Sequence, residues 1–428
     1  MAFAMVVVLG MAALSIDVAT LYLAKSEAQR AADAAAMAAA RAFVLTGTTT
    51  DVSTDFQGQT VATTLAQQQA LAALETNLIA GRPGQLVPPL TVTMNFGSQT
   101  NPTVSLTVEQ TALPTFFSRI WTRAAYRVSA TAVAEAYNPW ASSSNPAVNV
   151  RCVKPFIVPN ADPGHPIAST FEPFINVGGG ADGTLKNPGR AAPNGTGIIG
   201  ERLVFKADCP RGGCSNSNNV NPPVASVVPP TTLVLDFVPA NLPSASSGIS
   251  CPGCAGRRNQ FDDDISCCNT VQMACNTQSG NPVTVNPGNP MAVGTLTNSL
   301  QCLIHKSLAT GMDSLDTTGF PTVAGSPFRF VVGSLNPLVT GPSHVVNTGD
   351  LVNTSDSLIT LMIYDGSVIP PSGVVNIIGY MQVFVEDENG SDQFTGTILN
   401  IAGCGDAARA STIQGGGASP IAVRLIHN

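Results

Sequence analysis

The sequence predicts an α+β fold, in which a long hydrophobic N-terminal helix packs on a small antiparallel sheet and a β-rich, disulfide-stabilised domain follows. Three observations support this prediction: an apolar and then alanine-rich run that continues to residue 45, alternating strand patterns before residue 137, and ten cysteines confined to the last two thirds of the chain. The chain accordingly divides into residues 1–45 (a long helix), 46–137 (a small α+β domain), 138–150 (a linker) and 151–428 (a cysteine-rich β domain).

The first half of the N-terminal helix is strongly apolar. From Ala2 to Ala24 the polar residues are Ser15, Asp17 and Thr20, and the run contains no proline. At 1.5 Å per residue it can span a hydrocarbon core about 30 Å thick, so we expect a membrane helix. A cleaved signal peptide is the alternative, although no Lys or Arg precedes the run and no convincing small-x-small site ends it.

Asp17 is the acidic residue inside this apolar run. A carboxylate within lipid is costly unless it has a partner. Asp17 is therefore either a functional group that binds a neighbouring copy of the helix or a boundary residue that faces water, and the sequence leaves both interpretations open.

The second half of the helix, Ser26 to Ala42, is dominated by alanine. Alanine has the highest helix propensity, and its small side chain lets another backbone approach closely. We expect this half to pack tightly on another helix or on the chain's own sheet, with a plain surface helix as the alternative. The residues expected to form an assembly surface along the whole helix are Val6, Leu9, Leu14, Asp17, Tyr22, Gln29, Asp33 and Ala36.

A second helix and a small sheet are expected next. Between residues 60 and 79 apolar residues recur with a period near 3.6, and the Gly/Pro segment at 80–84 ends the pattern. Residues 90–96 and 104–108 alternate apolar and polar positions on either side of a turn, which predicts a hairpin. Residues 126–136 provide a third strand.

The rest of the chain alternates short β-type runs with turn-forming residues, which predicts a β-sandwich-like or otherwise β-rich domain. Residues 164–200 are rich in Gly, Pro and Asn and are expected to be loops, and the acidic segment 386–392 is expected to be a solvated hairpin turn rather than a Ca²⁺ site. The predicted strands cover residues 202–207, 231–238, 328–335, 358–365, 374–386 and 393–401.

The cysteines are expected to form structural disulfides in an oxidising compartment. A zinc ribbon or a thiol redox site is the alternative, but the C-x2-C at residues 251–254 lies among loop residues and a second such pair is missing. Cys209 and Cys214 are the best candidates for a local disulfide, and adjacent Cys267 and Cys268 are expected to pair with different partners. The full set of candidates is Cys152, Cys209, Cys214, Cys251, Cys254, Cys267, Cys268, Cys275, Cys302 and Cys404.

Charge and motifs exclude several function classes. A net charge of -7 and the scattered Lys and Arg residues provide no surface for nucleic acid. The sequence contains no G-x-S-x-G, H-E-x-x-H, phosphate-binding loop or haem-attachment motif. Catalytic, cofactor-binding and metal-binding residues are therefore not expected. The histidines look too scattered for a metal cluster or a catalytic triad: His165, His305, His344 and His427.

The N-terminal segment resembles the TadE/TadG-like proteins of tight-adherence (Flp) pilus systems. In that family an apolar helix leads into Asp-Val, then an aromatic residue, then a Q-x-A-A-D-A-A-A motif. The matching positions here are Asp17, Val18, Tyr22, Gln29, Ala31, Ala32, Asp33 and Ala34 to Ala36. Residues 112–136 are similar to the segment that closes the first domain of these proteins, so the resemblance covers roughly residues 8 to 137.

This resemblance implies an exported protein of the bacterial cell envelope with no catalytic residues, and a long helix on a small sheet is also the pilin-like plan. We expect a non-enzymatic structural subunit, inner-membrane anchored or in a surface filament. It would contact the membrane before assembly and then copies of itself or other pilin-like subunits through its N-terminal helix. The alternatives are an anchored pilus-assembly or envelope protein that does not polymerise, and an exported hydrolase on a membrane stalk.

Overall fold

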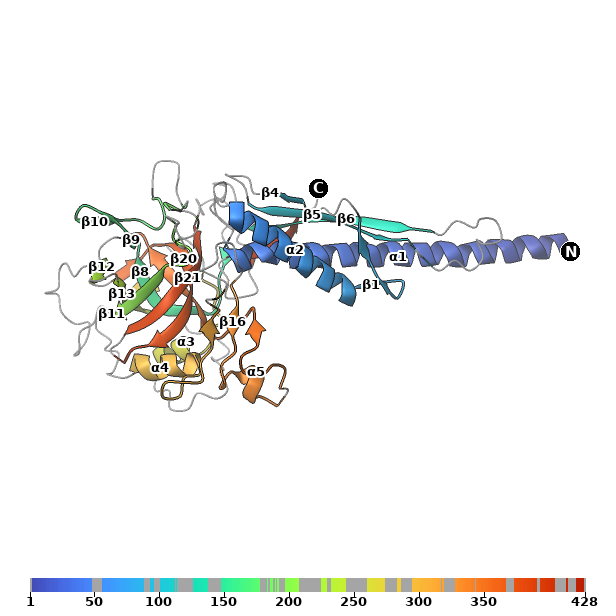
Figure 1. The fold of residues 1–428 in the computed structure, drawn as a ribbon. Helices are drawn as coiled ribbons and strands as arrows, with labels where there is room; N and C mark the ends of the chain where they lie inside the picture. Colours follow the sequence, from blue (N-terminus) through green and yellow to red (C-terminus); the bar gives the residue numbers. More distant parts are fainter. Residues whose placement is uncertain are drawn as a thin grey trace.

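One long helix, α1 (Ala2–Thr46), runs from the N-terminus to a β-rich body and sets the long axis of the molecule (Figure 1). Its bounds confirm the helix predicted over residues 2–45, and it ends where Gly47 adopts a positive φ of 65°. The computed structural model describes residues 2–47, 56–87, 93–95, 101–111, 113, 126–137, 148–177, 183, 185–187, 189, 191, 197–207, 225–228, 232–243, 260–273, 283–285, 295–316, 318, 328–342, 344–366, 373–390, 393–404, 413–414 and 421–426.

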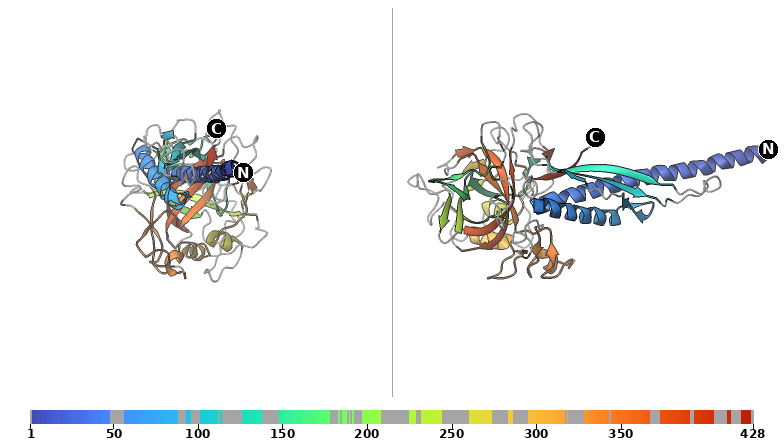
Figure 2. Two further views of the ribbon diagram at one scale, coloured as in Figure 1. Left: turned by 90° about the vertical axis from the view of Figure 1, so that its right-hand side faces the viewer. Right: turned by 45° about the horizontal axis from the view of Figure 1, so that its top comes forward.

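The second half of α1 lies between a second helix, α2 (Phe56–Thr76), and a five-stranded antiparallel sheet (Figure 2). Along β5 the side chains of Val104, Leu106 and Val108 are buried and their neighbours are half-buried, because alternate residues of a strand point to opposite faces. The predicted hairpin and third strand are confirmed. The strands are β3 (Gln85–Leu86), β4 (Thr93–Asn95), β5 (Thr103–Gln110), β6 (Val128–Tyr137) and β23 (Ala422–Ile426).

The predicted second helix is wrong at its C-terminal end. Leu78 and Ile79 leave the helix and form strand β1 (Leu78–Ile79), which pairs with β2 (Arg82–Pro83). The two residues between these strands, Ala80 and Gly81, have φ of 49° and 78°. Two consecutive positive φ values close a tight hairpin, and α2 ends at Thr76, three residues earlier than the helical period predicts.

The edge of the N-terminal sheet is completed by the end of the chain. Strand β23 pairs antiparallel with β6 from Ala422↔Tyr137 to Ile426↔Val133, and the Arg424 side chain forms an ion pair with Glu135 on β6. The division of the chain by sequence order assigns these residues to the cysteine-rich domain. Hydrogen bonding instead places them beside residues that precede that domain.

The β-rich body contains a closed barrel. Its ring runs β11-β21-β20-β18-β8-β13 and returns to β11 through the parallel pairing of β11 with β13. This closure corrects the sandwich alternative, because a sandwich leaves strand edges that the β11–β13 pairing removes. The strands are β8 (Val153–Pro159), β11 (Arg202–Ala207), β13 (Thr232–Asn241), β18 (Leu358–Tyr364), β20 (Ile377–Glu388) and β21 (Gln393–Gly403).

Aromatic rings fill the barrel core. Phe394 lies with its ring centroid 4.9 Å from that of Phe205, in a stacked arrangement, and 5.9 Å from those of Phe156 and Phe237. All four rings are fully buried. Burial of apolar side chains of this kind is the main stabilising term of a folded domain.

Two other sequence expectations differ from the structure. The segment expected to be loops from residue 164 includes a hairpin, in which Thr170 pairs with Ile167. The strand expected over 328–335 is reduced to two residues, because the Gly333 amide donates to the Asp313 carboxylate (2.8 Å) instead of a neighbouring strand.

The remaining elements are β7 (Val148–Asn149), β9 (Asp162–Ile167), β10 (Thr170–Glu172), β12 (Ala225–Val228), α3 (Gln260–Ser266), β14 (Val283–Val285), α4 (Thr295–Leu303), β15 (Ser314–Leu315), β16 (Phe330–Val331), α5 (Pro337–Thr340), β17 (Leu351–Val352), β19 (Gly373–Val375) and β22 (Ile413–Gln414).

Disulfides tie loops to the barrel. Cys152, directly before β8, is bonded to Cys268, which follows α3 at a sequence separation of 116. Cys267, Cys302 and Cys404 are also disulfide-bonded, and since Cys268 pairs with Cys152, Cys267 is bonded to another cysteine. The other candidates lie outside the described residues, and with them the proposed local pair: Cys209, Cys214, Cys251, Cys254 and Cys275.

The described part of the chain contains no helix that is both long and apolar enough to cross a membrane, so the membrane helix expected over residues 2–24 is not supported.

Candidate functional site

The first half of α1 carries exposed apolar side chains and extends beyond β5 and β6 (Figure 2). Each of these side chains is between 42% and 75% exposed. Apolar surface gathered in one place usually marks an interaction site. We name this surface the apolar strip, and its members are Met5, Val8, Met11, Leu14, Ile16, Val18, Tyr22 and Leu23.

A buried stripe runs along the opposite side of the same helix. Ala13, Asp17, Ala24 and Ala28 are buried, and their spacing of four, seven and four residues places them on one face at 3.6 residues per turn. Asp17 is 4% exposed and therefore belongs to the inward face of this chain. Of the two interpretations of Asp17, neither a water-facing carboxylate nor one directed at a neighbouring copy matches this position.

The residues expected to form an assembly surface separate into two groups. Leu14 and Tyr22 belong to the apolar strip, at 53% and 75% exposed. Gln29 and Asp33 are half-buried and bonded to each other, because the Gln29 amide donates to the Asp33 carboxylate at 2.8 Å. Ala36 is fully buried. Two expected residues lie in α1 with side chains outside the described part of the structure: Val6 and Leu9.

The alanine-rich half of α1 is a core element of its own chain. Its buried alanines share one apolar cluster with Ala62, Ala66 and Ala70 of α2 and with residues of β5 and β6. Ala36, one of the expected assembly residues, is enclosed within its own chain. The buried alanines of this half are Ala28, Ala31, Ala32, Ala35, Ala36, Ala39, Ala40 and Ala42.

Polar residues of α1 fix the helix on the sheet and hairpin beside it. The Lys25 ammonium donates to the Ser129 carbonyl of β6, and the Gln29 amide donates to the Thr131 carbonyl at 3.4 Å. The Glu27 carboxylate accepts a 2.7 Å hydrogen bond from the Ala80 amide in the β1–β2 turn. These bonds set the rotation of α1 about its axis, and this rotation leaves the apolar strip exposed.

The C-terminal end of α1 is joined to the barrel. The Leu45 carbonyl accepts a 2.6 Å hydrogen bond from the Phe328 amide, and the Val44 carbonyl accepts one of 3.2 Å from the Asn400 side chain on β21. A Cβ on Gly47 would lie 2.8 Å from a methyl group of Ile199, so the chain passes here too close to the barrel for any other residue. Helix and barrel therefore form a continuous structure.

Comparison with known proteins identifies the N-terminal segment. Residues 1–42 match the family model described as "Putative Flp pilus-assembly TadE/G-like". The N-terminal segment is therefore similar to this family over residues 1–42. The match confirms the resemblance over α1, whereas the similarity expected for residues 112–136 lies beyond the matched segment. No curated protein and no solved structure shows significant similarity to the chain.

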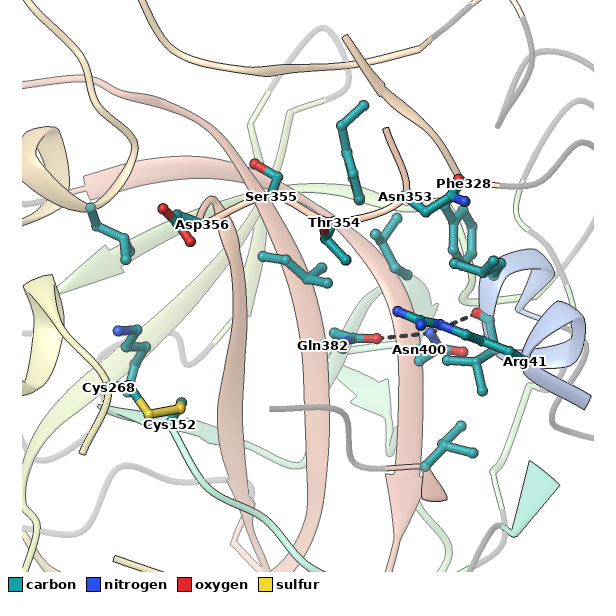
Figure 3. Close-up of a pocket in the computed structure, with 18 of the residues that line it drawn as sticks. Arg41, Cys152, Cys268, Phe328, Asn353, Thr354, Ser355, Asp356, Gln382 and Asn400 are labelled. Atoms are coloured by element: carbon teal, nitrogen blue, oxygen red, sulfur yellow. Dashed lines mark hydrogen bonds between the residues drawn. A yellow bond between two sulfur atoms is a disulfide. The ribbon is translucent and has the colours of Figure 1, made fainter. Parts of the chain in front are cut away.

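A cavity of about 960 Å³ lies between the end of the TadE/G-like helix and the barrel (Figure 3). Arg41 of α1 lies on the opposite side of the cavity from Ser355 and Asp356 (Figure 3), and Lys154 is also among the lining residues. The Lys154 ammonium is buried and donates to the Cys267 carbonyl at 2.6 Å. Burial lowers the pKa of Lys154 to about 7, although the carboxylates of Asp264 and Asp356 oppose this shift.

The cavity does not arrange a nucleophile with a base among the described residues. The Ser355 hydroxyl donates to Asp313 at 2.5 Å, while the His305 ring is bonded to the Asp356 carboxylate at 2.8 Å. The His305 hydrogen bond lowers the pKa of Asp356. The hydrolase alternative requires a serine or cysteine bonded to a histidine, and no pair of described residues shows that contact.

A second polar cluster lies on the side of the barrel away from the N-terminus, next to β9 (Figure 1). The His165 Nδ1 is 2.7 Å from Asp162 Oδ2 and 3.7 Å from Glu201 Oε1. Burial raises the pKa of Asp162, and burial together with the facing Asp162 raises the pKa of Glu201 to about 9. The spacing Asp-x-x-His was present in the sequence, but Glu201 comes from a distant segment, so sequence order did not reveal the cluster.

Proposed function

We propose that this protein is an exported, non-enzymatic, pilin-like subunit of a pilus or surface filament of the bacterial envelope, assembled through the apolar strip of α1. The observation that carries the proposal is the exposure of this strip on a segment that is TadE/G-like. A helix whose inner face is fixed by its own sheet, and whose outer face is apolar and exposed, has only its outer face available to a neighbour. The partners would be copies of this chain or other pilin-like subunits.

The packing of α1 supports the pilin-like comparison. The second half of α1 is buried against β5 and β6, while the first half extends past the strands. A helix anchored in this way can present its free half to neighbouring helices without any change in its own domain. Burial of eight large apolar side chains between helices would supply a substantial association energy, at about 25 cal/mol per Å² of apolar surface.

The test is a double variant of the apolar strip in the source organism, Leu14→Glu with Tyr22→Glu. We expect at least a tenfold loss of filaments in electron micrographs of sheared surface material, because charged side chains cannot be buried between helices without partners. The matched control is Leu308→Glu, since Leu308 is 94% exposed and lies outside α1. Unchanged filaments in the double variant, with the same thermal unfolding as the control, would contradict the proposal.

A non-polymerising envelope protein is the second candidate, favoured by the burial of Ala36 and Asp17 within the chain. These residues are not available for a helical bundle, so the contact surface is limited to one half of α1. Wild-type material that contains the protein in the envelope fraction but forms no filament or other particle would favour this candidate. In that case the double variant would change the amount retained in the envelope rather than any particle.

A further inference from the structure

The cluster of Asp162, His165 and Glu201 has the composition and spacing of a metal site. One ligand atom from each residue can be chosen so that all three lie within 4.8 Å of one another. In a tetrahedral zinc site with bonds of about 2.0–2.2 Å, ligand atoms lie about 3.3–3.6 Å apart. The measured separations from His165 Nδ1, 2.7 and 3.7 Å, lie on either side of that range. Small side-chain rotations would bring both separations into the range expected for zinc ligands.

The two carboxyl groups are removed from solvent. Asp162 is fully buried and Glu201 is 7% exposed, whereas His165 is partly exposed. Buried acidic groups that face each other require a proton, a basic partner or a cation between them. An imidazole beside two carboxylates is a ligand set suited to a divalent transition metal, and the exposed side of His165 leaves room for a water ligand.

An unpaired oxygen gives independent support. Glu201 Oε2 is buried and makes no hydrogen bond in the described structure, which is unusual for a carboxylate. The other Glu201 oxygen, Oε1, lies 3.7 Å from His165 Nδ1, so the Glu201 carboxylate borders the cluster. A bound cation would satisfy the unpaired oxygen.

The backbone around the cluster is adapted to bring the carboxylates together. The Gly164 amide donates to Asp162 Oδ1 at 2.9 Å and leaves Oδ2 directed at the histidine. A Cβ on Gly164 would lie 2.1 Å from Glu201 Oε1, so only glycine lets Glu201 approach β9 this closely. The site would connect β9 with the start of β11.

We propose that Asp162, His165 and Glu201 bind one divalent transition-metal cation of the Zn²⁺ type. The cation cross-links β9 to the segment that leads into β11 and completes its coordination with water on the exposed side of His165. This site is distinct from the apolar strip and does not depend on the proposed assembly function. The role proposed for the cation is this cross-link between the two segments.

The test uses the purified full chain after chelator treatment, titrated with Zn²⁺ and, in separate experiments, with Ca²⁺. We expect one equivalent of Zn²⁺ by elemental analysis after dialysis, a higher thermal unfolding midpoint, and Zn²⁺ binding tighter than Ca²⁺. Glu201→Gln and His165→Gln should each weaken Zn²⁺ binding by at least tenfold. The visible absorption of bound Co²⁺ should be lost in both variants, which reports ligation directly and does not depend on stability.

The matched control is Glu172→Gln, on neighbouring β10, where the carboxylate binds the Asn187 side chain at 2.7 Å and lies outside the cluster. It should bind Zn²⁺ as the wild type does. The proposal is overturned if the wild type binds less than a tenth of an equivalent of Zn²⁺, if Ca²⁺ binds more tightly, or if Glu201→Gln retains wild-type affinity. Equal weakening in the Glu172→Gln control would also overturn it.

Discussion

Alanine makes up most of the core between α1, α2 and the five-stranded sheet, whereas phenylalanine and branched aliphatic residues fill the barrel. A methyl group buries little area, so each alanine adds little hydrophobic free energy, but it lets a helix lie close to a sheet along many turns. The barrel instead gathers large side chains in one enclosed volume. We call α1, α2 and the five-stranded sheet the rod. The hydrophobic stabilisation of the rod is therefore spread over many small contacts, whereas that of the barrel comes from a few large side chains.

This difference predicts opposite sensitivities. A well-packed core of large side chains is damaged most by truncation, since a cavity remains. In a core of small side chains, truncation removes little buried area. Replacing a small side chain by a larger one forces the backbones apart. The comparison also separates functions, because the rod presents the apolar strip while the barrel carries the cavity and the proposed metal site.

The largest effect is expected in the barrel. Phe394→Ala should lower the free energy of unfolding by about 3–5 kcal/mol, because Phe394 packs on three other buried rings. The measurement is denaturant unfolding followed by tyrosine and tryptophan fluorescence and circular dichroism. The control is Phe171→Ala. Because the Phe171 ring is only partly buried, its removal should lower the free energy of unfolding clearly less. Equal losses in both variants would refute a concentrated barrel core.

An intermediate effect is expected in the rod. Ala35→Leu should lower the free energy of unfolding by about 1–3 kcal/mol, because Ala35 is fully buried and the added carbons have no space. Ala12→Leu makes the same change at an exposed position of α1 and should stay within about 0.5 kcal/mol of the wild type. Both variants are compared by thermal unfolding monitored at a helical circular-dichroism band. A neutral Ala35→Leu would mean that the helix is not held closely against its sheet.

The third prediction concerns pH and tests the join between rod and barrel. The folded pKa of Lys154 is lowered to about 7 from 10.5. Between these values the unfolded chain binds a proton that the folded chain does not, so Lys154 makes stability rise as pH increases from about 7 to 10.5. Between these two pH values the slope is at most about 1.4 kcal/mol per pH unit. Lys154→Met should flatten this rise, measured as unfolding midpoints at several pH values. An unchanged slope would show that the amine is hydrated.

Local sequence patterns predicted helices and strands well where interactions between neighbouring residues determine the secondary structure. The bounds of α1 and the alternation along β5 follow from helix propensity and strand periodicity, which involve only neighbouring residues. The end of α2 was missed, because Leu78 and Ile79 continue the helical pattern but Ala80 and Gly81 adopt positive φ. The TadE/G-like motif was recognisable because its residues lie close together in one segment, between Asp17 and Ala36.

Surfaces were predicted less accurately than elements. The expected assembly residues mixed Tyr22, which is exposed, with Ala36, which is buried. A helix made mainly of alanine has little amphipathic contrast, so its sequence does not show which face turns inward. The rotation of α1 is instead set by contacts with β6, including those of Lys25 and Gln29.

The sequence by itself determined the long helix, the presence of a β-rich, disulfide-bonded region and the TadE/G-like character of the start. These depend on composition and on spacing within a few residues. Tertiary structure alone decided the closure of the barrel, the return of β23 to β6, and the meeting of Asp162 with Glu201. Each of these joins segments far apart in the chain, and the free energy of such contacts depends on the packing of the whole fold rather than on any local pattern.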